Sequence, residues 1–292
     1  MERITKKAYA KINLGLDVLG KREDGYHELR MIMQTIGVHD EIAIEKTDKE
    51  ETIELTSNVP ELPCDENNLI YKAAKIMKEE YHLPGGLRIS LKKSIPMAAG
   101  LAGGSTDAAA VFNGLNELFS LGLSKEELCR HGVKVGADVP YCIVGGCFLA
   151  EGIGEKLTAL PALPNETILI VKPDFDVSTG YVYKTLDSKE ITEHPDIDGQ
   201  IAAIREGNLE KTVALMGNVL ETVTVEKHPE IRQIKEDMLS MHAYGAMMSG
   251  SGPTVFGFFH GEKAASDAAD HLKKKYPSAR ILATEMVQDI NG

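Results

Sequence analysis

Hydrophobic and polar residues alternate strictly from Lys7 to Leu16. Alanine, isoleucine and leucine occupy the even positions from 8 to 14, whereas lysine, tyrosine and asparagine occupy the odd positions, which include Lys11 and Asn13. Because successive side chains of a strand point to opposite faces, the pattern predicts a half-buried strand with Lys11 and Asn13 on its polar face. Such a face is usually solvated, so this strand alone does not assign either residue a function.

Similar patterns divide the rest of the chain into strands and helices. Period-two and β-branched runs predict strands at residues 31–37, 41–45, 52–56, 87–92, 167–171, 254–259 and 280–284. Apolar spacing of three and four predicts helices at residues 68–81, 105–118, 124–136, 197–205, 209–220, 229–240 and 262–276. Strands and helices interleaved in this way predict an α+β fold. The proline-rich segment 160–165 lies between two strand-like stretches and predicts a boundary between two domains, 1–160 and 161–292.

Composition and charge narrow the function classes. The 292 residues are 43% hydrophobic and 26% charged, which is typical of a folded globular protein with room for two domains. The 32 basic and 44 acidic residues give a net charge of −12, which disfavours binding to nucleic acid or to anionic membranes. The first residues lack the apolar stretch of a signal peptide, and the longest apolar run, 139–150, is too short to span a membrane. We therefore expect a cytoplasmic protein with no membrane partner.

A glycine-rich segment separates the predicted strand at 87–92 from the predicted helix at 105–118. Glycines permit close backbone approach and positive φ, and the first turn of the following helix points N–H groups and its positive dipole end at the same place. This is the layout of a phosphate-binding loop, although a connection needed only for tight packing would have the same composition. The lysine of a Walker A motif and the position of a Rossmann fingerprint are both missing. The candidate phosphate-binding residues are Pro96, Met97, Ala98, Ala99, Gly100, Leu101, Ala102, Gly103, Gly104, Ser105 and Thr106.

Three shorter segments carry side chains suited to binding or catalysis. Asp138 follows a predicted helix, and Pro140 favours an extended chain just before it, so this turn would hold the carboxylate rigidly. An aspartate in a turn is nevertheless more often a turn former. Tyr26 and His27 follow a polar turn, where binding residues often lie. The segment 248–254, MSGSGPT, is either a backbone nest for an anion or the end of a strand.

Taken in order, these segments resemble the motifs of the GHMP kinase superfamily, which includes galactokinase, homoserine kinase, mevalonate kinase and phosphomevalonate kinase. The lysine-bearing strand, the PMAAGLAGGST loop and the SGSGPT turn extend from Lys11 to Thr254, which is most of the chain. The segments AKINLGLDVLGKREDGYHEL, PMAAGLAGGSTDAA and GADVPYCIVGG are further similar to the family of kinases that act on a cytidyl-methylerythritol alcohol. The resemblance implies ATP-dependent phosphorylation of the 2-hydroxyl of the methylerythritol moiety, in the non-mevalonate isoprenoid pathway. It also implies an N-terminal domain like domain 2 of a ribosomal S5-type protein and a ferredoxin-like C-terminal domain.

The resemblance also assigns roles to the kinase residues. Asp138 matches the catalytic aspartate, which would accept the proton of the alcohol, and Lys11 matches the lysine that orients the hydroxyl. The glycine-rich segment would wrap the phosphates of ATP, with Mg²⁺ neutralising them, and Asn68 is a weaker candidate for contact with the base or ribose. No carboxylate is spaced from the loop in a way that identifies the metal ligands, so these stay open.

The same resemblance assigns the residues that would bind the small-molecule cytidyl-methylerythritol substrate. Tyr26 matches an aromatic side chain that stacks on cytosine, and His27 matches a residue that reads the edge of the base. Tyr183 is the expected second stacking partner, although Tyr181 can be aligned at that position instead. Two further polar residues expected near the diphosphate or polyol of the substrate are Asn13 and Thr179.

Three alternatives stay open at this point. A sister kinase would act on homoserine, mevalonate or a sugar, but such small polyols do not need an aromatic platform like Tyr26. A ligand sensor on the same fold would be expected to lose Lys11 or Asp138, and both are present. A nucleotide-binding scaffold would bind ATP without transferring its phosphoryl group. The sequence does not set the oligomeric state, for which we expect a monomer or a weak homodimer.

Overall fold

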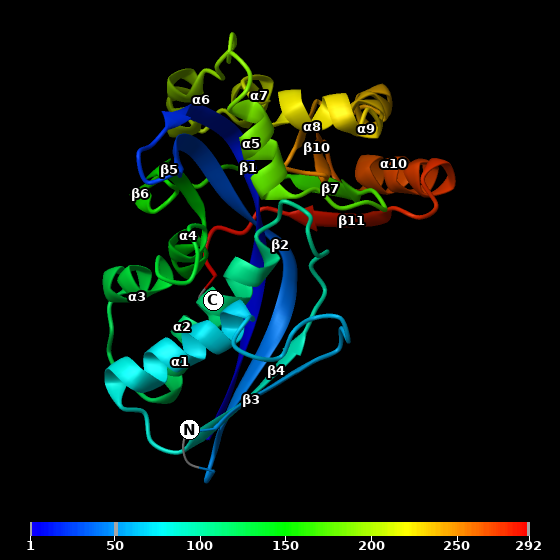
Figure 1. The fold of residues 1–292 in the computed structure, drawn as a ribbon. Helices are drawn as coiled ribbons and strands as arrows, with labels where there is room; N and C mark the ends of the chain where they lie inside the picture. Colours follow the sequence, from blue (N-terminus) through cyan, green and yellow to red (C-terminus); the bar gives the residue numbers. More distant parts are fainter. Residues whose placement is uncertain (1, 50–51, 291–292) are drawn as a thin grey trace. The chain divides into compact units, whose positions relative to one another are not determined.

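The computed structural model describes residues 2–49 and 52–290. By their internal contacts these residues form two compact units, each made of several chain segments. The first unit consists of Met1–Ala10, Val38–Ile95 and Ala102–Gly145, and the second of Lys11–Gly37, Pro96–Leu101 and Gly146–Gly292. Two long strands, β1 (Arg3–Lys21) and β2 (His27–Thr47), contribute residues to both units (Figure 1). The domain boundary that the sequence predicts between residues 160 and 161 stays a prediction.

The first unit combines part of a sheet with a group of helices (Figure 1). Strand β4 (Gly86–Lys92) pairs antiparallel with residues 41–47 of β2 and parallel with β3 (Ile53–Ser57). As the alternation predicts, the apolar residues of β4 are buried. The helices are α1 (Leu69–Tyr81), α2 (Gly103–Leu118), α3 (Lys125–Gly132) and α4 (Val139–Val144), and α2 packs against each of the others.

Local sequence signals set the ends of these helices. Ser124 and Glu127 form the predicted capping box at the start of α3, but this helix ends at Gly132, earlier than predicted. The prediction of an extended chain before Pro140 is wrong. Pro140 is the second residue of α4, where a proline is tolerated because its missing N–H would have no partner within the helix. Asp138 is therefore the N-cap residue of α4 rather than a residue in an extended loop.

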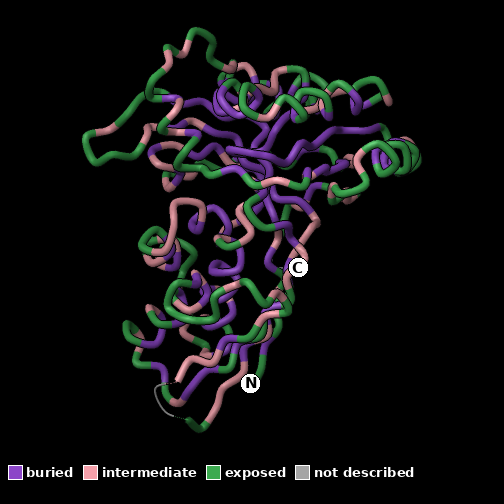
Figure 2. The backbone as a smooth tube through the Cα atoms, turned by 45° about the vertical axis from the view of Figure 1, so that its right-hand side comes forward, coloured by how far each residue is buried: buried purple, intermediate pink, exposed green. Residues whose placement is uncertain are grey.

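The second unit has an antiparallel sheet in the order β11-β7-β10-β9. Along the chain these are the fourth, first, third and second strands of that sheet, which is the order of a ferredoxin-like fold, as expected. Every residue of β10 is buried, as are residues 168–171 of β7, whereas the residues of β11 are intermediate or exposed (Figure 2). Helices α9 and α10 pack against the sheet. The bounds are β7 (Thr167–Lys172), α9 (Glu230–Ser240), β9 (Gly245–Met248), β10 (Val255–Phe259), α10 (Glu262–Lys275) and β11 (Arg280–Glu285).

The rest of the second unit extends the sheet that contains β1 and β2. Residues 29–34 of β2 pair antiparallel with β5, which in turn pairs with β6, and β8 pairs parallel with β1 at Gly15 and Leu16. The remaining elements are β5 (Cys147–Gly152), β6 (Lys156–Ala159), α5 (Thr179–Leu186), α6 (Ile197–Arg205), α7 (Leu209–Ala214), β8 (Gly217–Asn218) and α8 (Glu221–Lys227).

The structure corrects two further sequence predictions of elements. The strands predicted at 31–37 and 41–45 are parts of the single strand β2. The helix predicted at 209–220 ends at Ala214, because Gly217 and Asn218 leave it to pair with β1, and the Asn218 side chain then donates to the carbonyls of Met248 and Gly250. The apolar spacing within 209–220 therefore reflects two short elements that share one core.

Across the described residues, 2–49 and 52–290, no helix has both the length and the apolar character that crossing a membrane would need.

Candidate active site

Lys11 and Asn13 lie on β1 and are both buried, at 5% and 0% exposed. The Lys11 ammonium donates to Asn13 Oδ1 at 2.7 Å, and the Asn13 amide nitrogen lies 3.6 Å from the sulfur of Met31. A solvated strand face, the ordinary explanation of this alternation, is therefore wrong for these two residues. A buried ammonium held by a side-chain amide is an expensive arrangement that suits a binding or catalytic role better than a surface one.

The first half of the glycine-rich segment, Pro96–Leu101, lies against β1 and the turn at 249–252. The Lys11 backbone N–H donates to the carbonyl of Leu101 at 3.2 Å. The Ser249 hydroxyl donates to the carbonyl of Gly100 at 2.9 Å. Gly100 has φ of 72°, and a Cβ at this position would overlap the carbonyl oxygen of Ser249. The SGSGP turn thus supports the loop directly, although about 150 residues separate the two in sequence.

The second half of the segment forms the start of α2. The N-cap residue Ala102 provides no side-chain acceptor, so the N–H groups of the first turn point outward with the positive end of the helix dipole. Gly103 and Gly104 are helical and do not have the positive φ expected of them; Ala98 and Ala102 have it instead, at 47° and 56°.

Ser105 and Thr106 play different structural parts at this helix start. Ser105 is half-buried, whereas Thr106 is 3% exposed. The Thr106 hydroxyl donates to the carbonyl of Tyr9 at 2.6 Å, and its backbone N–H donates to Ala102. Contact between Thr106 and a phosphate stays a prediction, but both of its hydrogen-bond donors already have partners within the protein.

We expect Gly100→Ala to weaken ATP binding roughly tenfold or more, because a Cβ with positive φ would push the loop away from Ser249. Isothermal titration calorimetry measures the effect. Gly207→Ala is the matched control, since Gly207 has φ of 68° but open space around its Cβ position. It should cost stability without changing ATP affinity, and equal ATP affinities for the two variants would show that the loop has no binding role.

Asp138 lies in the first unit, at the N-terminus of α4, which packs against α2. Its side chain is half-buried. The preceding turn approaches the start of α2: an ideal Cβ on Gly136 would lie 3.9 Å from the Ser105 hydroxyl. Within this unit the turn that leads to the catalytic candidate therefore lies next to the start of α2. Lys11 belongs to the second unit, and its pairing with Asp138 stays a prediction.

The aromatic candidates form a cluster in the second unit. The rings of His27 and Tyr183 stack with centroids 4.7 Å apart, and His27 Nε2 lies 2.6 Å from a carboxylate oxygen of Asp187. Hydrogen bonds from Lys21 and His27 hold the pKa of Asp187 below its usual value. Tyr26, next to His27, is 57% exposed. Tyr26 therefore presents an exposed ring beside the His27 imidazole, which the Asp187 carboxylate holds in place. Asp187 is not among the residues that the sequence indicates.

The remaining binding candidates have contacts of their own. The ring of Tyr181 lies beneath the Lys227 ammonium at 4.0 Å, whereas the ring of Tyr183 stacks on His27, and the pairing of Tyr183 with Tyr26 stays a prediction. The Thr179 hydroxyl lies 2.8 Å from that of Ser251 in the SGSGP turn. Asn68 is the N-cap of α1, accepting from Ile70 N–H, and its amide donates to the carbonyl of Pro63. A nucleotide contact by Asn68 stays a prediction.

Two family models match separate parts of the chain. Residues 68–146 match the GHMP kinases N terminal domain, and residues 200–278 match the GHMP kinases C terminal domain. Together the matches include the glycine-rich segment, Asp138 and the SGSGP turn.

Curated relatives extend the similarity to almost the whole chain. A 4-diphosphocytidyl-2-C-methyl-D-erythritol kinase of Lachnospira eligens is 51% identical, over 98% of this chain and 99% of its own length. The protein of the same name from Lachnoclostridium phytofermentans is 53% identical, over 92% of each chain.

Solved structures agree with the family matches and with the curated relatives. A crystal structure of 4-(cytidine 5'-diphospho)-2C-methyl-D-erythritol kinase is 32% identical with a TM-score of 0.81, covering 97% of this chain and 99% of its own. A homoserine kinase from Cytophaga hutchinsonii has a TM-score of 0.82 at 20% identity, covering 99% of this chain and 96% of its own, which shows the shared fold.

The motif order, the two domain matches and near-complete coverage by relatives at about half identity all agree. The two domain matches and the solved structure also confirm the expected two-domain GHMP kinase fold. This chain belongs to the 4-diphosphocytidyl-2-C-methyl-D-erythritol kinase family of the GHMP kinases.

Proposed function

We propose that this kinase transfers the γ-phosphoryl group of ATP to the 2-hydroxyl of 4-diphosphocytidyl-2-C-methyl-D-erythritol, giving the 2-phosphate and ADP in the non-mevalonate isoprenoid pathway. The observation that carries the proposal is the identity of about half over 98% of the chain with a kinase named for that substrate. The presence of Lys11, Asp138 and the exposed Tyr26 supports it.

The reaction needs a base and a fixed hydroxyl. An alcohol is a poor nucleophile at neutral pH, so we assign Asp138 the role of accepting its proton as the oxygen bonds to the γ-phosphorus. The bond from that phosphorus to the β–γ bridging oxygen breaks, and ADP leaves. We assign the Lys11 ammonium the role of orienting the hydroxyl and stabilising developing negative charge.

ATP is the co-substrate of a GHMP kinase, and the glycine-rich segment is the proposed site of its phosphates. The close packing of Gly100 on Ser249 supports a fixed backbone there, and the N-terminus of α2 adds N–H groups and a favourable dipole. Such local N–H groups and a helix dipole are needed to bind ATP because the net charge of −12 of the whole protein repels a polyphosphate.

Mg²⁺ fits this site as part of the nucleotide complex. Among the described residues no group of three or more His, Cys, Asp or Glu side chains is placed to hold a metal ion. Mg²⁺ in nucleotide sites is commonly held by phosphates and water with one or two protein ligands. We propose that it enters with ATP and offsets the phosphate charge.

The assay that tests the proposed function measures ADP release with the cytidyl substrate, homoserine and mevalonate in parallel. We expect ADP release only with the cytidyl substrate. Equal turnover of homoserine or mevalonate would point to a sister kinase. ATP binding without ADP release for any of the three would point to a nucleotide-binding scaffold.

Tyr26→Ala is expected to raise KM for the cytidyl substrate roughly tenfold, because stacking one base on an aromatic ring contributes about 1–3 kcal/mol. KM for ATP should stay nearly unchanged, and Tyr26→Phe should behave like the wild type, since the ring face rather than the hydroxyl makes the contact. Steady-state kinetics measures both constants. A Tyr26→Ala protein that melts early but keeps its KM for the cytidyl substrate would show that Tyr26 packs rather than stacks.

Two further properties complete the proposal. We propose that the protein works in the cytoplasm, where ATP is available, and that it is a monomer or a weak homodimer. Size-exclusion chromatography with light scattering at several concentrations measures the oligomeric state.

A further inference from the structure

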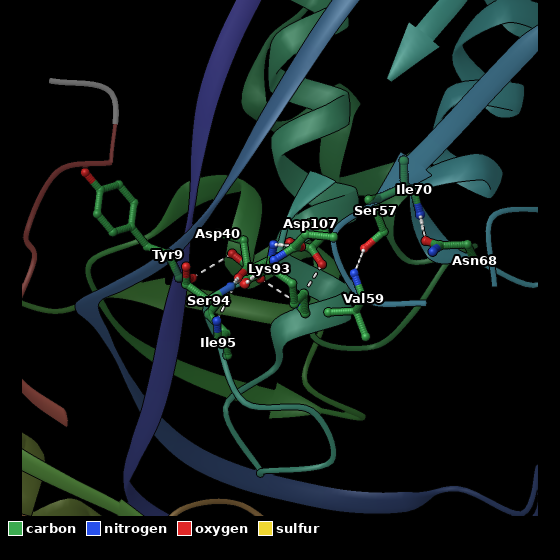
Figure 3. A network of polar contacts seen from close by, with 12 residues as sticks. Tyr9, Asp40, Ser57, Val59, Asn68, Ile70, Lys93, Ser94, Ile95 and Asp107 are labelled. Carbon is green, nitrogen blue, oxygen red and sulfur yellow. Dashed lines mark hydrogen bonds and ion pairs between the residues drawn. The ribbon is translucent and has the colours of Figure 1, made fainter. Parts of the chain in front are cut away.

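Three charged side chains meet in the interior of the first unit, beside the start of α2 (Figure 3). The Lys93 ammonium lies 2.5 Å from a carboxylate oxygen of Asp40 and 2.7 Å from one of Asp107. The side chains of Asp40, Lys93 and Asp107 are 0%, 5% and 4% exposed. Neither the kinase motifs nor the roles assigned above account for this group, which we call the Asp40–Lys93–Asp107 network.

One end of the network holds the chain just before the glycine-rich segment. The Asp40 carboxylate accepts the backbone N–H groups of Ser94 and Ile95, the latter at 2.7 Å (Figure 3). These are the last two residues before Pro96. Hydrogen bonds to an ionised carboxylate are about twice as strong as neutral ones, so the entry to the loop is fixed in place.

The other end holds the chain just after that segment. Asp107 belongs to α2, which begins at Gly103. The Lys93 ammonium is also packed closely against the helix start, since an ideal Cβ on Gly103 would lie only 2.9 Å from it. Through Lys93, the residues before the loop are thus tied to the helix that follows it.

The network is poorly arranged for stability alone. Two carboxylates share one ammonium, and burial together with the nearby Asp40 raises the pKa of Asp107 well above its usual value. One oxygen of Asp107, Oδ1, is buried without a hydrogen-bond partner among the described residues. Apolar side chains of similar volume commonly stabilise a core as well as a buried charged triad does. A group with an unsatisfied buried oxygen therefore points to a positional role.

We propose that the Asp40–Lys93–Asp107 network fixes the distance between the two ends of the glycine-rich segment and thereby holds its backbone in the conformation that binds the phosphates of ATP. Its members are positioning residues that act through the loop backbone. The inference rests on the proposed function only in naming ATP as the ligand of the loop.

Asp107→Ala is the decisive variant, because alanine suits a helix that continues with Ala108–Ala110 and removes the unsatisfied oxygen. We expect the Kd for ATP, measured by calorimetry, to rise roughly tenfold, as when one charge-assisted hydrogen bond is lost. KM for ATP should rise similarly, with KM for the cytidyl substrate nearly unchanged. Hydrogen exchange of the Ser94 and Ile95 amides should accelerate, while the melting temperature does not fall. Asp107→Asn keeps an acceptor for Lys93 and should restore ATP affinity.

Asp237→Ala provides the control, since Asp237 on α9 is also a part-buried carboxylate bound by several groups, including Lys275 and Tyr276. This variant should lower the melting temperature without changing ATP affinity. Unchanged ATP affinity in Asp107→Ala would overturn the proposal, as would a loss of affinity in proportion to lost stability in both variants. If the wild type bound ATP but did not phosphorylate the cytidyl substrate, the proposed function would be wrong. The role of the network would still be decided by the ATP affinities of the variants, which calorimetry measures without any phosphoryl transfer.

Discussion

Asp138→Asn is expected to lower kcat by roughly 10²- to 10⁴-fold while leaving the affinity for ATP nearly unchanged. Asparagine keeps the size and polarity of the side chain but cannot accept the proton of the alcohol. The Asp138 side chain makes no capping hydrogen bond to α4, and its backbone carbonyl accepts from Cys142 N–H, so the helix and its packing on α2 should survive. The expected loss therefore belongs to the chemical step, and single-turnover kinetics with saturating ATP measures it.

Asp196→Asn is the matched control for this substitution. Asp196 is the N-cap of α6, where its side chain accepts the Gly199 N–H, and asparagine caps helices about equally well. Its kcat should stay within about twofold of the wild type. If Asp138→Asn retained the same activity as Asp196→Asn, Asp138 would have no part in proton transfer.

Lys11→Met is expected to lower kcat roughly 10²- to 10³-fold, the usual effect of removing one donor that stabilises developing negative charge. Methionine fits the buried site on β1 and keeps most of the side-chain volume. It leaves Asn13 Oδ1 without the ammonium, so a modest loss of stability should accompany the loss of activity.

Lys7→Met separates these two effects. Lys7 occupies the same alternating face of β1 four residues earlier, but it is exposed. This variant should be fully active, with an unchanged melting temperature. Normal kcat in a folded Lys11→Met protein would remove the lysine from the mechanism and leave Lys11 as a structural residue.

Much of the architecture could be predicted from local patterns. Helices α6 and α10 and strand β4 follow the sequence closely, because each carries one apolar face of the right period between clear stop signals. The short helix α5 was not predicted, because its eight residues supply little periodic signal. The end of α7 at Ala214 was missed because Gly217 and Asn218 join a strand distant in sequence.

In the candidate site, too, local features could be predicted from the sequence and non-local contacts could not. The glycine-rich segment and Asp138 are recognisable because their chemistry lies in contiguous residues. The burial of Lys11 depends on non-local packing, with its backbone bonded to Leu101, and alternation alone does not encode that contact. The bond between Lys93 and Asp40 joins positions 53 residues apart, so no local pattern could indicate it.

Phosphorus NMR of the product shows directly whether this kinase phosphorylates the 2-hydroxyl of its cytidyl substrate. After incubation of the wild-type protein with ATP, Mg²⁺ and the cytidyl-methylerythritol substrate, we expect a new phosphomonoester signal coupled to the 2-position and an equal amount of ADP. The diphosphate signals of the cytidyl group should remain. ATP that disappears without a new phosphomonoester, or a phosphate found at another hydroxyl, would contradict the assignment of this chain as the 2-hydroxyl kinase.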